Sequence, residues 1–420
     1  MSRRRIYLDY ASTTPLDPRV LKAMEPFFAK TFGNPSSIHA EGAAAKKALD
    51  TARTTVARCL EAHAEEIVFT SGGTESNNLV IFGVLQSPLL KGALPSSAGG
   101  LLQPPPRRLG TPFIKGDKPH IVTTNIEHSS ILEPLRELER QGKAEVTYVP
   151  VEANGIVKPE KILSAIKPNT VLVSVMYANN EIGTVQPIRK IGQMLKAHHL
   201  KISKSQNFKI LFHVDGCQAP LYLRCFVNAL GVDLLTLDGH KIYGPKGVGA
   251  LYVRRHTPLT PLLLGGGQER GLRSMTENIP AIVGFAEALR IATAEREKES
   301  ARVAKLRDHL CADILENTSI ENVVVNGSME EGERLPSNLN ISLLGVDTEF
   351  LTLQLDAAGI AVSTKSSCLK DEKESYVVAA LGGSAKRATS SLRFTLGRSI
   401  KESHIEYCAD TLGKLLRKVA

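Results

Sequence analysis

The 420-residue chain lacks the features that mark membrane and secreted proteins. It contains no run of 18 apolar residues, so no transmembrane helix is predicted. Met1–Arg5 leads directly into Ile6 without an apolar core, which indicates neither a signal peptide nor a transit peptide. With 42% hydrophobic and 23% charged residues, the chain has ample material for a large core, so disorder is excluded as its main state.

The sequence also lacks any cysteine pair at C-x-x-C spacing, although it has six cysteines. This absence argues against a structural zinc site and a thioredoxin-like motif, and no metal site is predicted. A chain of this length does not need disulfides, which favours a reducing, cytoplasmic location. A lone cysteine is usually an inert, buried small residue, so a nucleophilic role requires further support.

A strong charge imbalance is also missing, since 52 Lys and Arg stand against 43 Asp and Glu for a net charge of +9. Residues 86–118 contribute four of these nine positive charges, because they contain five basic residues and one Asp. Eleven residues of the same segment are Pro or Gly. We interpret this segment as a surface insertion. No nucleic-acid-binding motif is present, so direct binding of nucleic acid is not predicted.

Short apolar segments alternate with helical patterns over the first two-thirds of the chain. Several of these segments are continuously apolar, which is typical of strands covered on both faces. The alternation predicts an α/β domain with a large, mostly parallel, seven-stranded sheet. The predicted strands are 66–70, 120–124, 145–149, 170–176, 209–214, 234–237 and 249–253.

The last third has a different pattern and predicts a smaller α+β domain. A long helix is expected over 279–317, followed by a strand at 338–343, a helix at 348–358 and a closing helix to 420. We expect the amino-terminal segment to join this domain. The predicted boundaries are 17–295 for the large domain and 1–16 plus 296–420 for the small domain.

Three short motifs suit the chemistry of an aldehyde cofactor with a phosphate group. Lys241 follows a predicted strand, where its amine could form a Schiff base. Gly73 and Thr74 stand between a strand and a helix, where backbone N–H groups can cradle phosphate. Asp215 ends an apolar strand and needs a cationic partner if buried, such as a pyridinium nitrogen. Each motif alone is also typical of an ordinary loop or helix cap.

Together these motifs resemble the cysteine desulfurase family, among the class-V aminotransferase-like pyridoxal phosphate enzymes of fold type I. The resemblance covers nearly the whole chain. Its signatures, in order, are Tyr7–Thr14, Gly33–Ser37 with His39, Ser71–Ser76, Glu127–His128, Asn179–Gly183, Val214–Asp215 with Gln218, Gly239–Gly247, Gly265–Ser274, Ser366–Cys368 and Ser391–Phe394.

The resemblance implies cofactor-binding roles for seven residues. Lys241 would hold pyridoxal 5'-phosphate covalently, and Asp215 would keep its ring nitrogen protonated. Gln218 would bond the phenolic oxygen of the cofactor. The residues implied for the phosphate are Gly73, Thr74, His240 and, from the partner subunit of a homodimer, Thr276.

The resemblance also implies roles around the substrate, L-cysteine. His128 would stack on the cofactor ring and transfer protons, and the residues implied to bind substrate are Asn34, Asn180 and Arg393. Cys368 matches the cysteine that takes the sulfur as a persulfide. A polar, charged sequence follows Cys368, which favours an accessible loop, as a nucleophilic thiolate requires.

The implied function is the conversion of L-cysteine to L-alanine with sulfur passed to an acceptor protein, either an iron–sulfur scaffold or a tRNA-thiolation enzyme. The remaining positive charge could steer an acidic acceptor. Two alternatives stay open: a selenocysteine lyase or related pyridoxal phosphate β-lyase, and a catalytically weak sulfur-relay or scaffold protein.

The chain departs from the family pattern at several positions. Asp238 stands where the family commonly has a Ser that bonds the phosphate, so it is expected to turn away, pair with a cation or weaken cofactor binding. Lys365, near Cys368, would either lower the thiol pKa or be solvated. Met275 stands where Gly is usual. The chain ends at Ala420, so a longer tail that docks an iron–sulfur scaffold is not expected.

Overall fold

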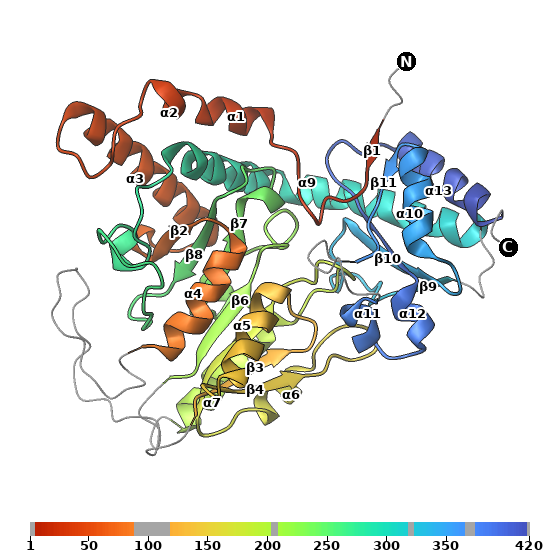
Figure 1. Cartoon of the computed structure of the whole chain (residues 1–420), viewed down its shortest axis with the longest axis horizontal. Helices are drawn as coiled ribbons and strands as arrows, with labels where there is room; N and C mark the ends of the chain where they lie inside the picture. The colour runs from red at the N-terminus through yellow and green to blue at the C-terminus, as the bar shows by residue number, and fades with distance from the viewer. Residues whose placement is uncertain (1–4, 88–117, 203–208, 318–322, 366–373, 418–420) are drawn as a thin grey trace.

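The computed structural model describes residues 5–87, 118–202, 209–317, 323–365 and 374–417. Figure 1 shows a large α/β part and a smaller part, with one long helix, α9 (Ile279–Asn317), running across both. The large part is built on a seven-stranded sheet of order β2-β8-β7-β6-β5-β3-β4. Its strands are β2 (Ile67–Thr70), β3 (His120–Thr124), β4 (Glu145–Val149), β5 (Thr170–Met176), β6 (Leu211–Asp215), β7 (Leu234–Asp238) and β8 (Gly249–Val253).

The sheet confirms the predicted fold class. All seven predicted strands belong to it, with ends that differ by at most two residues. Strands β3 to β7 pair in parallel, and only β8 runs antiparallel to its two neighbours, β2 and β7. Parallel strands are buried on both faces, and each residue of β5 and β6 is buried accordingly.

Helices cover both faces of this sheet, and the alternation of side chains along the strands explains why. In β8, Ala250 and Tyr252 join one hydrophobic core, whereas Leu251 and Val253 join a second core on the opposite face. The helices of this part are α1 (Pro18–Met24), α2 (Pro26–Ala29), α3 (Ala40–Leu60), α4 (Gly73–Leu85), α5 (Ser129–Arg140), α6 (Pro159–Ser164), α7 (Ile188–Ile202) and α8 (Val227–Leu230).

The smaller part packs around a three-stranded antiparallel sheet of order β12-β10-β9 and has its own hydrophobic core. The long helix and the strand at 338–343 are found as predicted. The elements here are β9 (Val323–Val325), β10 (Asn338–Leu343), α10 (Thr348–Ala357), β11 (Ile360–Ala361), α11 (Tyr376–Ala380), α12 (Ala385–Thr389), β12 (Ser391–Thr395) and α13 (Glu402–Leu416).

The amino-terminal segment lies against this smaller part. Strand β1 (Ile6–Tyr7) pairs in parallel with β11, and Leu8 packs in the same core as Leu339 and Phe394. The domain boundaries at 17–295 and at 1–16 plus 296–420 remain a prediction. The proposed insertion at 86–118 lies almost wholly outside the described residues.

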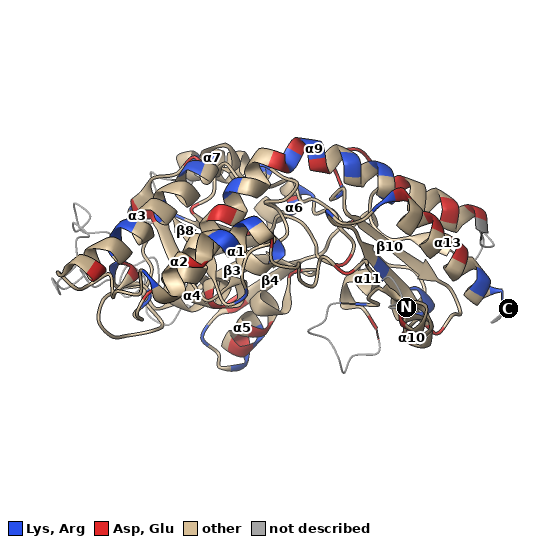
Figure 2. Cartoon of the chain, turned by 90° about the horizontal axis from the view of Figure 1, so that it is seen from above, with Lys and Arg blue, Asp and Glu red and all other residues tan. Residues whose placement is uncertain are grey.

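Charges of both signs are interspersed over the described surface, as Figure 2 shows along α9 and α13. On α9, Arg290 pairs with Glu287 and Arg302 pairs with Glu299, each one helical turn away. None of the helices in the described ranges combines the length and apolarity needed to cross a membrane.

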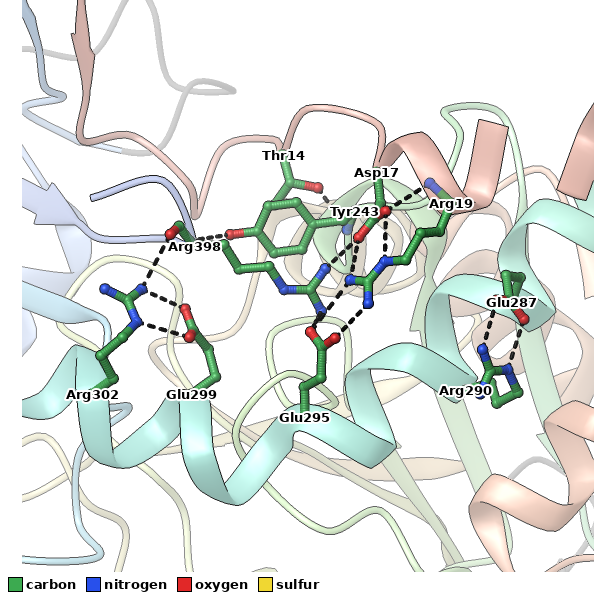
Figure 3. A network of polar contacts seen from close by, with 10 residues as sticks. All are labelled: Thr14, Asp17, Arg19, Tyr243, Glu287, Arg290, Glu295, Glu299, Arg302 and Arg398. Atoms are coloured by element: carbon green, nitrogen blue, oxygen red, sulfur yellow. Dashed lines mark hydrogen bonds and ion pairs between the residues drawn. The ribbon is translucent and has the colours of Figure 1, made fainter. Parts of the chain in front are cut away.

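A polar network around Tyr243 joins the two parts (Figure 3). Arg398, which follows β12, places its guanidinium 2.8 Å from Asp17 Oδ2 and 3.1 Å from Glu295 Oε2. The same guanidinium lies over the Tyr243 ring, 4.4 Å from its centroid, and the Arg398 N–H donates to Tyr243 Oη. A hydrogen bond from the Arg19 side chain, together with Arg398, lowers the pKa of Asp17.

We predict that Arg398→Ala lowers the free energy of unfolding by about 2 to 3 kcal/mol, because it leaves the mostly buried Asp17 with one guanidinium partner fewer. Urea denaturation followed by circular dichroism measures the change. Arg290→Ala is the matched control, since it removes an exposed ion pair from α9 and should cost about 0.5 kcal/mol or less. Equal losses in the two variants would contradict the prediction.

Candidate active site

A cavity of about 190 Å³ lies at the carboxyl edge of the seven-stranded sheet, where open α/β sheets bind their ligands. The segments after β2, β3, β5, β6 and β7 contribute to its lining, as do the amino-terminal segment and β12. Nine of the predicted site residues line it together: Gly73, Thr74, His128, Asn180, Asp215, Gln218, His240, Lys241 and Arg393.

Lys241 stands in a single 3-10 turn, Gly239–Lys241, directly after β7. Its Nζ donates to the backbone carbonyls of Ala11 (2.7 Å) and Ser12 (2.8 Å). Gln218 Nε2 donates to the same Ala11 carbonyl at 3.0 Å. The amino-terminal segment therefore holds the Lys241 amine at the cavity.

Asp215 is the last residue of β6 and is buried, with 7% of its surface exposed. Its Oδ2 accepts from Asn77 Nδ2 at 2.8 Å, and its Oδ1 accepts from the Cys217 N–H at 3.0 Å. Neither bond brings a cation to the carboxylate. A ligand with a protonated ring nitrogen would supply the missing positive charge.

His128 caps the amino end of α5 and is linked to Asp215 through polar side chains. Its Nδ1 accepts from the Ser130 N–H at 3.2 Å and lies 2.8 Å from Ser130 Oγ. A ring nitrogen that accepts in this way carries no proton, so the neutral ring is protonated on Nε2. Asn77 Nδ2 donates to Ser130 Oγ and to Asp215 Oδ2, both at 2.8 Å, which completes the network.

Arg393 enters the cavity from β12 of the small sheet and is 1% exposed. Its guanidinium donates to Asp9 Oδ1 (2.7 Å), Ser12 Oγ (2.8 Å) and the Asn180 carbonyl (3.0 Å). Its Nε is buried without a hydrogen-bond partner. A buried donor without a partner is costly, and a small carboxylate ligand would satisfy it.

The amino end of α4 forms a narrow cradle beside these groups. A Cβ atom at Gly73 would lie 2.6 Å from Cys217 Sγ, so only glycine fits there. His240 Nδ1 lies 3.1 Å from Thr13 Oγ1, and burial lowers the pKa of His240. Asp238 does not turn away from this cradle, because its Oδ2 accepts from the Gly73 N–H at 2.7 Å.

Glu127, next to His128, is a buried acid that belongs to one of the sequence signatures but was given no role there. Burial raises its pKa to about 8, which favours the protonated form of the carboxyl at neutral pH. Its Oε1 accepts from Thr124 Oγ1 (2.5 Å) and from the Met176 N–H (2.9 Å). Its backbone carbonyl accepts from Tyr376 Oη, which ties the start of α5 to α11.

Three predicted site residues are not brought into the cavity by the described part of the chain. Asn34 is exposed, and its Oδ1 accepts from the Ser36 N–H at 2.9 Å. Thr276 is exposed beside the exposed Met275, and the resemblance assigns it to the site of the partner subunit. Cys368 lies outside the described residues. All three assignments remain predictions.

The structure also brings in residues to which the sequence assigned no role, namely Asn77, Asp9 and Ser12. Asn77 had a detectable signal, since it follows Gly73 by four residues and therefore lies on the same face of α4. Asp9 and Ser12 both accept hydrogen bonds from Arg393, which lies more than 380 residues further along the chain. No local pattern indicates such contacts.

The side chains around the cavity fit pyridoxal phosphate. A lysine amine, a buried carboxylate and the amino end of a helix face one cavity. The Oδ1 atom of Asn77, in the lining, is buried without a hydrogen-bond partner and leaves room for a further donor. The one feature that opposes the fit is the Asp238 carboxylate at Gly73.

Comparisons with known proteins agree with this chemistry. The model of the family "Aminotransferase class-V" matches residues 6–94 and 107–407. A protein described as cysteine desulfurase IscS from Dictyoglomus turgidum is 39% identical over 418 residues, which cover 99% of this chain and 96% of that protein. A mitochondrial cysteine desulfurase of Arthroderma benhamiae is 42% identical over 408 residues, covering 96% of this chain and 73% of that protein.

The fold has close solved counterparts. The structure of a NifS-like protein superimposes with a TM-score of 0.83 at 33% identity, and the match covers 99% of this chain and 100% of that one. The overall fold is therefore shared over nearly the whole chain.

Proposed function

The chain belongs to the cysteine desulfurase family within the class-V aminotransferases, and we propose that it uses pyridoxal phosphate to remove sulfur from L-cysteine, releasing L-alanine. The observation that carries the proposal is the convergence of Lys241, Asp215 and Arg393 on one cavity. Lys241 supplies an amine for an aldehyde cofactor, and Asp215 supplies a carboxylate for the ring nitrogen of that cofactor. Arg393 supplies a guanidinium that can donate two hydrogen bonds to the substrate carboxylate.

Lys241, Asp215, Gln218 and the amino end of α4 would hold the cofactor, which when bound supplies an aldehyde carbon and an electron-withdrawing ring. The Ala11 and Ser12 carbonyls would hold the Lys241 amine at the cavity before the cofactor binds. Asn77 keeps the Asp215 carboxylate oriented, because it donates to one of its two oxygens.

Arg393 and Asn180 would bind the substrate carboxylate. Arg393 is already fixed by Asp9 and Ser12, so little conformational entropy is lost when the substrate binds. His128, whose Nδ1 is occupied by Ser130, would move protons through Nε2.

Cys368 would take the sulfur. Its thiolate attacks the sulfur of the bound cysteine, an S–S bond forms and the substrate Cβ–S bond breaks. The electron pair left on the substrate β-carbon takes up a proton on the way to alanine, and Cys368 retains the persulfide. We further propose that an acceptor protein, either an iron–sulfur scaffold or a tRNA-thiolation enzyme, then removes this sulfur.

Lys365, near Cys368, does not act as a solvated cation in the described structure. Its Nζ lies 3.1 Å from Glu349 Oε1, and its side chain is 12% exposed. This pairing argues against Lys365 as a strong perturbant of the Cys368 thiol, because Glu349 offsets its charge.

We also propose a cytoplasmic homodimer. Large apolar side chains are exposed in α2, in the segment between α2 and α3, and in the segment before α9 that carries Thr276, namely Phe28, Phe32, Ile38, Leu264 and Met275. Covering such side chains with a second copy would remove apolar surface from water. A second copy that covers them would allow its Thr276 to reach the phosphate, as the resemblance implies.

The activity is tested by incubating the purified, cofactor-loaded protein with L-cysteine and a thiol reductant. We expect alanine and sulfide to appear in equal amounts. L-Selenocysteine is assayed in parallel, because a selenocysteine lyase would use it and spare L-cysteine. Absence of alanine from a protein that shows bound cofactor would contradict the proposal and favour a scaffold or relay role.

A further inference from the structure

The carboxylate of Asp238 lies where an anion would bind at the amino end of α4. Asp238 is the last residue of β7, and its side chain is 12% exposed. Its Oδ2 accepts from the Gly73 N–H at 2.7 Å, and its Oδ1 accepts from the His240 N–H at 3.3 Å. One carboxylate thus spans two segments that both line the cavity.

The contact is close because two glycines leave room for it. A Cβ atom on either Gly72 or Gly73 would lie 3.2 Å from Asp238 Oδ2. The helix behind these glycines, α4, is 13 residues long, and its amino end carries the positive pole of the helix dipole. The carboxylate is therefore stabilised by this pole.

We propose that Asp238 competes with the cofactor phosphate for the amino end of α4, so that phosphate can bind there only when the carboxylate leaves Gly73. The inference rests on the proposed function, because it assumes a phosphorylated cofactor in this cavity. Two anions at one helix end repel each other. In addition, the single Gly73 N–H cannot donate a full hydrogen bond to both of them.

The structure offers the displaced carboxylate another partner. Asp238 Oδ1 lies 3.5 Å from His240 Nε2 and already accepts from the His240 N–H. Rotation of the Asp238 side chain away from Gly73 moves both oxygens, and the nearby His240 imidazole is a group that the carboxylate can contact instead. The cofactor phosphate would thus bind at the cost of one charge-assisted hydrogen bond and gain less affinity than an empty helix end would give it.

The consequence is specific to the phosphate group of the cofactor. Pyridoxal, which lacks the phosphate, needs only the groups around the ring, such as Lys241 and Asp215. Asp238 should therefore lower the affinity for pyridoxal phosphate and leave the affinity for pyridoxal unchanged. The ratio of the two dissociation constants isolates the effect.

The test measures both dissociation constants for cofactor-free protein by titration, following the absorbance of the Lys241-bound form. Asp238→Ser should bind pyridoxal phosphate about 10- to 100-fold more tightly, the factor that corresponds to one hydrogen bond to a charged group. Its affinity for pyridoxal should match that of the unmodified protein. Asp238→Asn, which keeps the shape and removes the charge, should show a gain of the same sign.

Asp50→Ser is the matched control, because it removes the same charge from an exposed position on α3 and should change neither constant. A second readout uses inorganic phosphate alone as the probe. Phosphate in place of chloride should raise the melting temperature of cofactor-free Asp238→Ser more than that of the unmodified protein.

Two results would overturn the inference: an unchanged or weaker affinity of Asp238→Ser for pyridoxal phosphate, or an equal change for pyridoxal and its phosphate. Failure of the proposed function looks different, since neither compound would then give an absorbance that depends on Lys241. In that case the phosphate melting experiment still decides whether Asp238 excludes an anion from α4.

Discussion

Lys241→Ala is expected to abolish covalent attachment of the cofactor and to reduce alanine formation from L-cysteine by at least about a thousandfold. The amine of Lys241 is held at the cavity by the Ala11 and Ser12 carbonyls, and no other lysine lines this cavity in the described part of the chain. Absorbance spectra of the purified variant and an alanine assay measure the two losses.

Lys246→Ala is the matched control for this variant. Lys246 follows in the same Gly-rich turn but is exposed, and it does not line the cavity. Its absorbance and turnover should remain close to those of the unmodified protein. If Lys241→Ala retained the visible absorbance of bound cofactor and its turnover, the assignment of Lys241 would be wrong.

The seven-stranded sheet could be predicted because most of its strands are buried on both faces. Strands β3, β4, β5 and β8 begin and end at the predicted residues, although β4, at the edge of the sheet, is partly exposed. Strand β6 is shifted because Lys209, at the predicted start, is exposed and pairs with Asp233. Strands β1 and β11 have two residues each, which is too short for any periodic signal.

The site could be predicted where its residues follow strand ends. Asp215, Lys241, Gly73 and Thr74 occur at the carboxyl ends of β6, β7 and β2, so their meeting follows from the parallel sheet. The amino-terminal segment was recognised as a motif without a role. Its carbonyls at Lys241 depend on packing between the two parts of the chain, which no local pattern encodes.

For Asp238 the sequence left three outcomes open, and the structure favours one of them. The side chain does not turn away, and it bonds the helix end that the cofactor phosphate would need. His240, whose imidazole lies 3.5 Å from the carboxylate, is the cation that such pairing would need, and burial lowers its pKa. The lowered pKa disfavours the charged ring that would offset the carboxylate, so weakened cofactor binding is the expected outcome.

Cys368→Ser is expected to keep the cofactor absorbance while sulfide release from L-cysteine falls by about a hundredfold or more. The described residues on either side support this role. The Ser363 backbone pairs with that of Arg393, and Ser375 Oγ donates to Glu181 Oε2 at 2.6 Å, next to Asn180. The segment with Cys368 is thus attached at both ends to residues adjoining the substrate site.

Cys59→Ser is the matched control for the loss of a thiol. Cys59 is half-buried at the end of α3, and burial raises the pKa of its thiol, so it should not act as a nucleophile. Alanine and sulfide are both measured, because a β-lyase that does not need Cys368 would keep full sulfide release in Cys368→Ser. Full sulfide release in Cys368→Ser would exclude the persulfide step. Loss of sulfide release with retained cofactor absorbance would instead support a desulfurase and exclude the β-lyase alternative.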